Sequence, residues 1–163
     1  PVHKISIVSR GMALGYTMPL PEEDHLLYGK NKFQDELAGL LGGRVAEEEV
    51  FGEITTGASN DLERVTSLAR RMVTQYGMSE VLGPRTFGEK EELVFLGREI
   101  GEQRNYSEEV AEAIDKEVRS LVREAHDRAR EIIRAYRSKL DELAHRLIEQ
   151  ETVDASEFAA MFA

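Results

Sequence analysis

Cysteine is absent from this chain of 163 residues, and proline occurs only 4 times. Without cysteine, the chain has no disulfide framework, thiolate nucleophile, cysteine-ligated zinc finger or iron–sulfur cluster. No apolar run approaches the roughly 20 residues of a membrane-spanning helix. Positive charge is also scarce, with 21 basic against 31 acidic residues and a net charge of −10. A surface this acidic argues against nucleic-acid binding, which normally uses a basic patch.

The composition of the chain is that of a folded protein. Apolar residues make up 41% of the chain and charged residues 32%, a balance typical of globular domains. The length suits one domain with a sizeable hydrophobic core. The chain begins with Pro1 and runs directly into a strand-like segment, without polar residues that fray at a natural N-terminus. We therefore expect it to be a segment of a longer polypeptide.

The pattern of apolar residues changes from strand-like to helical early in the chain. Alternation between apolar and polar residues predicts a β-hairpin over residues 3–8 and 14–20. Helical spacing then predicts a first helix over about residues 30–51, ended by Gly52. The fold class predicted for the whole chain is mainly α with a small β-hairpin or sheet.

A second helical stripe follows a short polar connector and ends at Gly77. Either Ser59 or Asn60 can cap its start. Glu63 follows Asn60 by three residues, as in a capping box. The glycine-rich residues 77–106 are longer than an ordinary connection, so they form either a functional loop or a small, irregular strand region. Short strands are the favoured interpretation.

The last third of the chain, residues 107–163, is predicted to be helical. Ser107 is expected to cap this helical part, and a break is predicted near Arg137. Asp154 is predicted to cap a short final helix.

Taken by themselves, the residues contain no complete catalytic constellation. None of the 4 histidines has a second histidine at the i, i+4 spacing of a zinc-binding helix. Glu22 with His25, and Glu142 with His145, match the Glu-x-x-His element of di-iron bundles, but that architecture needs two such motifs on facing helices. Coincidence is the favoured interpretation of both pairs.

Three features in the middle of the chain call for closer interpretation. Gly42 and Gly43 fall inside the first predicted helix, where each glycine costs about 1 kcal/mol relative to alanine, so a close approach to the backbone is expected there. Glu48 forms either a surface pair with Arg44 or a buried carboxylate that supports a site. Asp61 is either an ordinary acid in a first helical turn or a carboxylate presented to a metal or a substrate. Spacing alone does not choose between these alternatives.

Several motifs stand in one order along the chain: Leu40-Leu41-Gly42-Gly43-Arg44-Val45-Ala46-Glu47-Glu48, Thr55-Thr56-Gly57-Ala58-Ser59-Asn60-Asp61-Leu62, Ala69-Arg70-Arg71-Met72-Val73, Tyr76-Gly77-Met78-Ser79 and Phe95-Leu96-Gly97-Arg98. Together they resemble the peptidase domain of FtsH, a family of membrane-anchored, ATP-dependent zinc metalloproteases. The resemblance covers essentially the whole chain.

The resemblance implies an FtsH-like peptidase fold with a zinc site. In that family a helix bearing His-Glu-x-x-His supplies two imidazole ligands and the glutamate that acts as general base. A third ligand, an aspartate, comes from a different helix and corresponds to Asp61. Glu47, Glu48 and Asn60 are then candidates for residues that support the site without binding Zn²⁺.

This sequence departs from the family pattern in one way, because the His-Glu-x-x-His helix expected just before Pro1 is absent. The ATPase domain, through which ATP would act, and the membrane anchors are expected still further upstream. The chain then holds one of three zinc ligands and no catalytic residue. We expect a zinc metalloendopeptidase in the full-length protein, and a segment that binds no catalytic zinc and cleaves nothing by itself.

The resemblance also implies partners and an internal organisation. Unfolded or membrane proteins are the expected substrates, a homo-hexamer is the expected assembly, and the membrane is reached through upstream segments, with this soluble domain on the cytoplasmic, stromal or matrix side. Residues 1–163 are expected to form a single domain, with a zinc-site portion and small sheet in 1–106 and a C-terminal helical portion in 107–163.

Two further hypotheses remain at this stage. A free strand edge could accept an extended substrate as an added strand. The candidate residues for this edge are Leu14, Gly15, Tyr16 and Thr17. The alternative function is a non-catalytic helical oligomerisation module derived from the same family.

Overall fold

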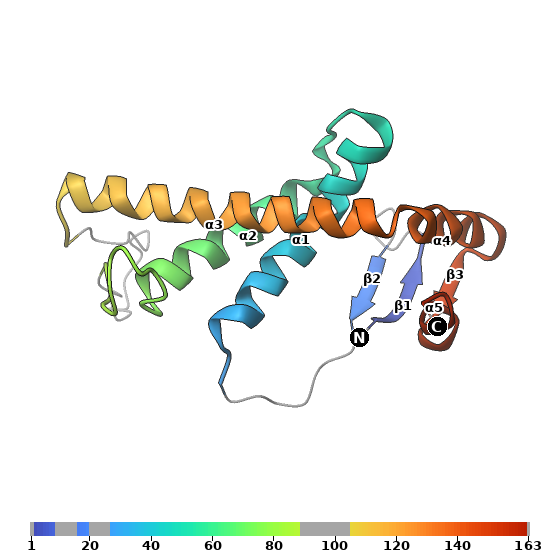
Figure 1. Cartoon of the computed structure of the whole chain (residues 1–163), viewed down its shortest axis with the longest axis horizontal. Coiled ribbons are helices and arrows are strands. Elements are labelled where there is room, and N and C mark those ends of the chain that lie inside the picture. The colour runs from blue at the N-terminus through green and yellow to red at the C-terminus, as the bar shows by residue number, and fades with distance from the viewer. Residues whose placement is uncertain (1, 9–15, 20–26, 89–104, 163) are drawn as a thin grey trace, which may run out of the picture. The chain divides into compact units, whose positions relative to one another are not determined.

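The computed structural model of the protein (Figure 1) describes residues 2–8, 16–19, 27–88 and 105–162. Helices dominate, and one small antiparallel sheet of three strands accompanies them, which confirms the predicted fold class. The chain divides into two compact units, Tyr28–Glu131 and Pro1–Leu27 with Ile132–Ala163. Within the described residues, no helix combines the length and the apolar character needed to cross a membrane.

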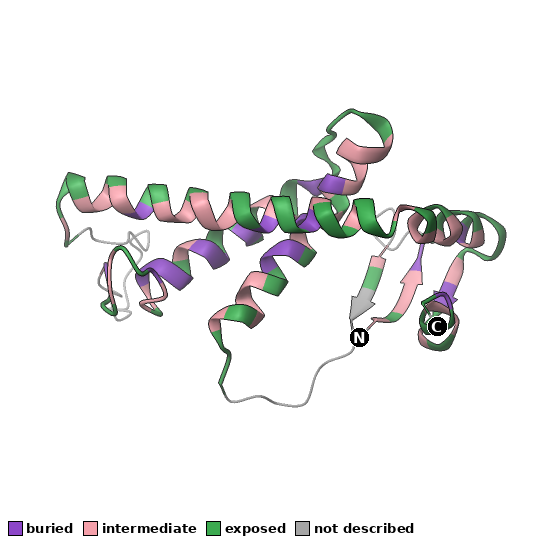
Figure 2. Cartoon of the chain, viewed as in Figure 1, coloured by how far each residue is buried: buried purple, intermediate pink, exposed green. Residues whose placement is uncertain are grey.

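The unit Tyr28–Glu131 is built on two helices that pack against each other, α1 (Lys30–Phe51) and α2 (Ser59–Thr74). Helix α1 has the predicted bounds and ends at Gly52, whose φ of 67° is left-handed. Figure 2 shows buried positions alternating with exposed ones along both helices, as amphipathic helices require. The buried side chains are Leu37, Ala38, Leu41 and Val45 on α1, and Val65, Leu68, Ala69, Met72, Val73 and Thr74 on α2.

The connection into α2 differs from the predicted one. Neither Ser59 nor Asn60 caps the helix, because the N-cap position is Ala58 and no side chain caps there. A single 3-10 turn, η1 (Thr56–Ala58), runs directly into α2, and the cap lies in front of that turn. There the hydroxyl of Thr55 accepts a hydrogen bond from the Gly57 amide at 3.1 Å.

The close approach expected at Gly42 and Gly43 is also wrong for the part of the chain that the structure describes. A Cβ atom built on either glycine would meet no described atom within 4 Å. Gly77 is different, since its φ is 59° and a Cβ there would lie 3.1 Å from the Cα of Pro84. Helix α2 ends at Thr74, three residues before the predicted end at Gly77. Beyond that end the Met78 amide donates to the Met72 carbonyl at 2.9 Å.

The short strands predicted between residues 77 and 106 are absent from residues 77–88 and 105–106, and the rest of that segment lies outside the described residues. Phe87 is instead buried in a small core with Val73 and Ile114. Ile114 belongs to the long helix α3 (Glu108–Ala135). As predicted, the hydroxyl of Ser107 accepts a hydrogen bond at its start, from the Val110 amide at 3.4 Å.

The second unit contains the sheet and the last helices. Strand β1 (Val2–Ser6) pairs antiparallel with β2 (Tyr16–Pro19), which confirms that the two predicted segments pair. A third strand that the sequence did not suggest, β3 (Thr152–Asp154), pairs with the other side of β1, so the order is β2-β1-β3. The predicted break is confirmed at Tyr136, which separates α3 from α4 (Arg137–Gln150). Asp154 caps α5 (Ala155–Ala160), also as predicted, and the structure adds a complete capping box with Glu157.

Candidate functional site

Asp61 lies in the first turn of α2, three residues after η1 ends at Ala58. An acid there is favoured by the positive end of the helix dipole. Its side chain is 45% exposed, and Oδ1 lies 3.7 Å from Nη1 of Arg64, one turn further along. An ion pair this long and this exposed is weak, so the carboxylate stays accessible. The donor is a carboxylate oxygen, a group that Zn²⁺ accepts as one of its four ligands, and in this respect Asp61 fits a metal site.

Glu47 holds the connection that leads to Asp61. Its carboxylate accepts hydrogen bonds from the amide of Thr55 at 3.2 Å and from the Thr55 hydroxyl at 3.1 Å. The same hydroxyl accepts the hydrogen bond from Gly57, so one side chain of α1 fixes the turn in front of α2. Glu47 is thus an acceptor for neutral donors.

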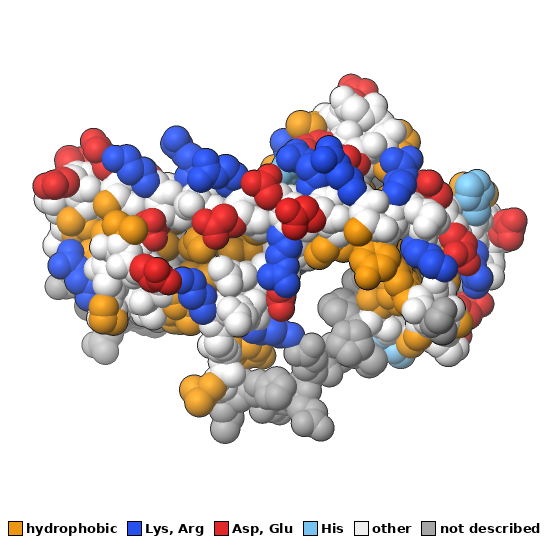
Figure 3. Space-filling view, viewed as in Figure 1, with side chains coloured by type: hydrophobic (Ala, Val, Ile, Leu, Met, Phe, Trp, Pro, Cys, Tyr) orange, Lys and Arg blue, Asp and Glu red, His pale blue; other side chains and the backbone are white. Residues whose placement is uncertain are grey.

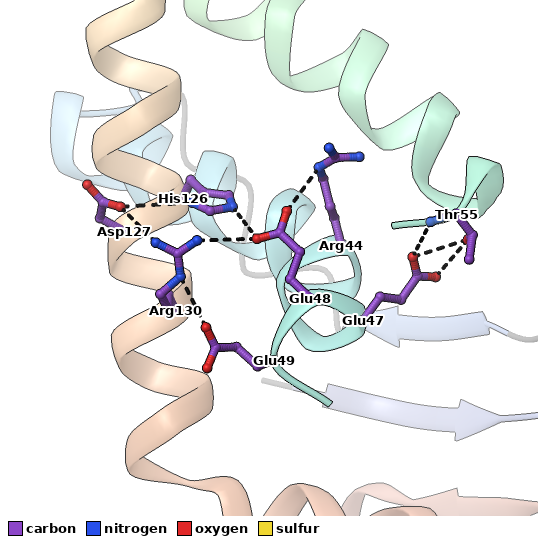
Figure 4. A network of polar contacts seen from close by, with 8 residues as sticks. All are labelled: Arg44, Glu47, Glu48, Glu49, Thr55, His126, Asp127 and Arg130. Carbon is purple, nitrogen blue, oxygen red and sulfur yellow. Dashed lines mark hydrogen bonds and ion pairs between the residues drawn. The ribbon is translucent and has the colours of Figure 1, made fainter. Parts of the chain in front are cut away.

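Glu48 points toward α3, away from Glu47 (Figure 4). Its side chain is only 19% exposed, and its Oε2 lies 3.0 Å from Nε2 of His126 and 3.3 Å from Nη2 of Arg130. The other oxygen lies 3.5 Å from Nε of Arg44. The surface pair with Arg44 that the sequence suggests is therefore only one of three contacts of Glu48, and the carboxylate is largely buried. Glu49 joins the same network, 3.2 Å from Nε of Arg130.

Sequence reasoning missed the two α3 residues of this network, His126 and Arg130. Both lie more than 70 positions from Glu48, at separations of 78 and 82 residues, so no local pattern joins them. One signal was available: three consecutive glutamates at the C-terminal end of a helix are unfavourable with the helix dipole and call for cations from elsewhere.

Figure 3 shows how charged side chains are distributed on one face of the molecule. Basic and acidic groups alternate along α3. They pair across elements, as where Nη2 of Arg128 lies 2.8 Å from Oδ1 of Asp35 on α1, and where Nη1 of Arg70 on α2 lies 3.6 Å from Oδ1 of Asp115. Some of the charged side chains of α3 thus form ion pairs with α1 and α2.

The other residues singled out in the sequence belong to two different units. Asn60 is exposed beside Asp61. Tyr16 and Thr17 lie on β2, at the end of the strand order, and Leu14 and Gly15 fall outside the described residues. Among the residues that the structure describes, no group of three or more His, Asp or Glu side chains is placed to hold a metal ion.

The two Glu-x-x-His elements do not form a di-iron site in the described part of the chain. Glu22 and His25 lie outside it. Glu142 is held by Lys139 at 3.4 Å and Arg146 at 3.0 Å, and these hydrogen bonds, that of Lys139 first, lower the pKa of its carboxyl group. His145 uses Nδ1 to contact the carbonyl of Asp141 at 2.7 Å.

Comparison with known proteins gives matches along nearly the whole chain. Residues 1–161 match the family model of peptidase family M41. The chain is 61% identical over 162 residues to an ATP-dependent zinc metalloprotease, FtsH 1, of Sphaerobacter thermophilus, which covers 99% of this chain and 25% of the relative. It is 57% identical over 162 residues to FtsH 1 of Thermomicrobium roseum, with the same coverage. It is 56% identical over 158 residues to FtsH of Thermotoga maritima, covering 96% of this chain and 26% of that protein. The chain therefore spans about a quarter of the length of these relatives.

Proposed function

Because this chain belongs to peptidase family M41, we propose that it is the peptidase part of an ATP-dependent zinc metalloendopeptidase that degrades unfolded or membrane proteins. The family match over residues 1–161 is the observation that carries this proposal. The names of the relatives, which are ATP-dependent zinc metalloproteases, supply the reaction class. We keep the expectation that residues 1–163 form one peptidase domain, made of the two units described above.

Asp61 is the proposed zinc ligand of this chain. Its position in the first turn of α2 and its 45% exposed carboxylate support this role. The two imidazole ligands and the general-base glutamate are proposed to come from a His-Glu-x-x-His helix outside this chain. When bound, zinc supplies Lewis acidity for activating water and polarising the scissile carbonyl group. The task of α2 and the preceding turn is to hold the Asp61 carboxylate in place.

The neighbouring polar residues are proposed to support Asp61 without binding the metal. Glu47 holds the Thr55 turn from which α2 begins, and its carboxylate is occupied by those donors. Glu48 is turned to α3, and its contacts with His126 and Arg130 make it an anchor of α1. Asn60, exposed next to Asp61, is proposed to contact the site from the solvent side.

We propose that an extended substrate adds to the outer edge of β2, where Tyr16 and Thr17 lie and toward which Leu14 and Gly15 lead. Support comes from the strand order, because β2 is at the end of the sheet. We also propose that the whole protein is a homo-hexamer anchored in a membrane by segments outside this chain, with this domain on the cytoplasmic, stromal or matrix side. Light scattering of the detergent-solubilised whole protein measures the assembly.

The test uses the longer protein, expressed with the residues that precede this chain in its gene. We expect Asp61→Ala to lower zinc affinity and casein hydrolysis by at least about 100-fold, because a ligand of the metal is lost. Asp115→Asn is the matched control, since Asp115 also forms a long, exposed ion pair with an arginine, 3.6 Å from Arg70. This control should retain zinc and activity.

Two results would contradict the proposal. Full zinc occupancy and unchanged hydrolysis in Asp61→Ala would remove Asp61 from the metal site. A preceding sequence without His-Glu-x-x-His would instead support the alternative function, a non-catalytic oligomerisation module of the same family.

A further inference from the structure

The last turn of α1 carries three consecutive glutamates, Glu47, Glu48 and Glu49. This is the end of the helix where the backbone dipole is negative, so each carboxylate is unfavourable there. The side chains of Glu48 and Glu49 are also only 19% and 18% exposed, which weakens their hydration. Within α1, Arg44 lies 3.5 Å from Glu48, and a further cation near this turn stabilises its carboxylates.

Helix α3 supplies one such cation, the guanidinium of Arg130, and its planar shape fixes orientation as well as charge. The guanidinium of Arg130 reaches two successive carboxylates, with Nη2 3.3 Å from Glu48 and Nε 3.2 Å from Glu49. His126, one turn earlier, lies 3.0 Å from the same oxygen of Glu48. A planar group that contacts two neighbouring side chains at once restricts the rotation of the turn that carries them.

Glu47 faces the other side of this turn (Figure 4). Its carboxylate holds both the amide and the hydroxyl of Thr55, and the hydroxyl in turn holds the amide of Gly57. Asp61 follows within the first turn of α2. The orientation of the Glu47 side chain therefore depends on the last turn of α1, which α3 holds in place. The Thr55–Gly57 turn before Asp61 depends in turn on its hydrogen bonds to Glu47.

We propose that Arg130 and His126 are positioning residues for Asp61, acting through the last turn of α1 and the Glu47–Thr55 hydrogen bonds. This inference rests on the proposed role of Asp61 as a zinc ligand. Outer residues that orient metal ligands typically change metal affinity by 10–100-fold when they are removed. The sequence separation between α3 and Asp61 hides this relation from any local pattern.

The competing explanation is that these residues merely hold α3 to α1. The chain offers a matched control for that explanation, because Arg128 of α3 lies 2.8 Å from Asp35 near the opposite end of α1. Arg128→Gln removes an ion pair between the same two helices, and it leaves the last turn of α1 untouched. A purely structural role predicts the same consequences for both arginines.

The first measurement is amide hydrogen exchange by NMR on this chain, which requires neither zinc nor activity. The amides of Thr55 and Gly57 report the relevant hydrogen bonds directly. We expect Arg130→Gln to raise their exchange rates about fivefold or more, and Arg128→Gln to change them less than about twofold. Arg130→Lys, which keeps the charge but loses the planar fork, should fall between wild type and Arg130→Gln.

The second measurement is zinc affinity in the longer protein, determined by competition with a chelator. We expect Arg130→Gln to weaken zinc binding about tenfold, and Arg128→Gln to leave it unchanged. If Arg130→Gln does not fold by circular dichroism, His126→Gln and His126→Leu take its place. The glutamine retains a donor for Glu48 and should preserve protection, whereas the leucine should not.

Equal exchange at Thr55 and Gly57 in both arginine variants would overturn the inference, and so would an Arg130 variant with wild-type exchange. The exchange result does not depend on the metal, so it can fail while Asp61 still proves to be a ligand. Conversely, Asp61 can fail as a ligand while the exchange difference stands, in which case the coupling exists but serves no zinc site, and the positioning role is rejected.

Discussion

At the start of α5, one carboxylate satisfies several donors at once. Asp154 Oδ1 accepts hydrogen bonds from the amides of Ser156 and Glu157, both at 2.9 Å, and from the Ser156 hydroxyl at 2.7 Å. These bonds, that from the Glu157 amide first, lower the pKa of Asp154 below its ordinary value of 3.8, because they favour the charged form.

The lowered pKa of Asp154 makes the stability of the chain depend on pH. The folded state binds the proton more weakly than the unfolded chain, so this stabilisation is complete above pH 3.8 and is lost as the pH falls through the lower folded pKa. Asp154→Asn retains an N-cap side chain and does not titrate. We expect the difference in urea midpoint between wild type and variant to be constant above about pH 5 and to shrink below about pH 4. A difference that is the same at pH 3 and pH 7 would contradict this assignment.

Ser6 shows why single residues can escape a sequence-based prediction. Ser6 alternates with Ile5 and Ile7 in the first predicted strand, a pattern that favours a solvent-facing position for Ser6. In the structure Ser6 is only 3% exposed, and Ile7 is 45% exposed. The Ser6 hydroxyl accepts a hydrogen bond from the Thr152 hydroxyl and donates one to the Glu151 carbonyl. Those partners lie 146 and 145 positions away, so burial was invisible to a local pattern.

Helices were the elements that the sequence predicted well. The bounds of α1 and the break before α4 follow from apolar spacing and from residues that stop helices. The end of α2 at Thr74 lies three residues before the predicted end at Gly77. Strand β3 was missed because it has three residues and depends on pairing with β1. The cap of α2 was misplaced because η1 precedes it, and a 3-10 turn has no apolar period of its own.

The glycines inside α1 give a test at the scale of elements. Gly42→Ala or Gly43→Ala should stabilise this chain by about 1 kcal/mol each, because no described atom lies within 4 Å of the added Cβ and alanine is the better helix former. Gly77→Ala is the opposite control, and it should destabilise, since its φ is 59° and Pro84 is close. Urea unfolding measures all three variants. Destabilisation by Gly42→Ala would contradict this prediction, because it would mean that another group packs closely against Gly42 in solution.

At the scale of the whole molecule, the sequence predicted the kind of site only through its family resemblance. The residues themselves left Asp61 and Glu48 open to ordinary interpretations, since a first-turn acid and an i, i+4 pair are common in helices. The structure adds the contact of Glu47 with Thr55, 8 positions along the chain, and those of Glu48 with His126 and Arg130, 78 and 82 positions away. No periodicity encodes such contacts.

Zinc binding provides the test at this scale. We expect this chain by itself to bind no stoichiometric zinc at micromolar concentration and to cleave no casein, because a single carboxylate supplies one of the four ligands that zinc needs. The longer protein with the preceding residues should bind one zinc per chain, and removal of the metal by a chelator should abolish its hydrolysis. Metal analysis after gel filtration measures both. Zinc-dependent cleavage by this chain alone would contradict the assignment of the remaining ligands to a preceding segment.

The position of β1 in the centre of the sheet has a consequence for synthesis on the ribosome. Its neighbour β2 emerges soon after it, but Thr152 in β3 is made 146 positions after Ser6. At a translation rate of about 5–20 residues per second, one edge of β1 therefore stays unpaired for roughly 7–30 seconds. During that interval the nascent chain presents a strand edge to other polypeptides, and the edge closes only after β3 has been synthesised.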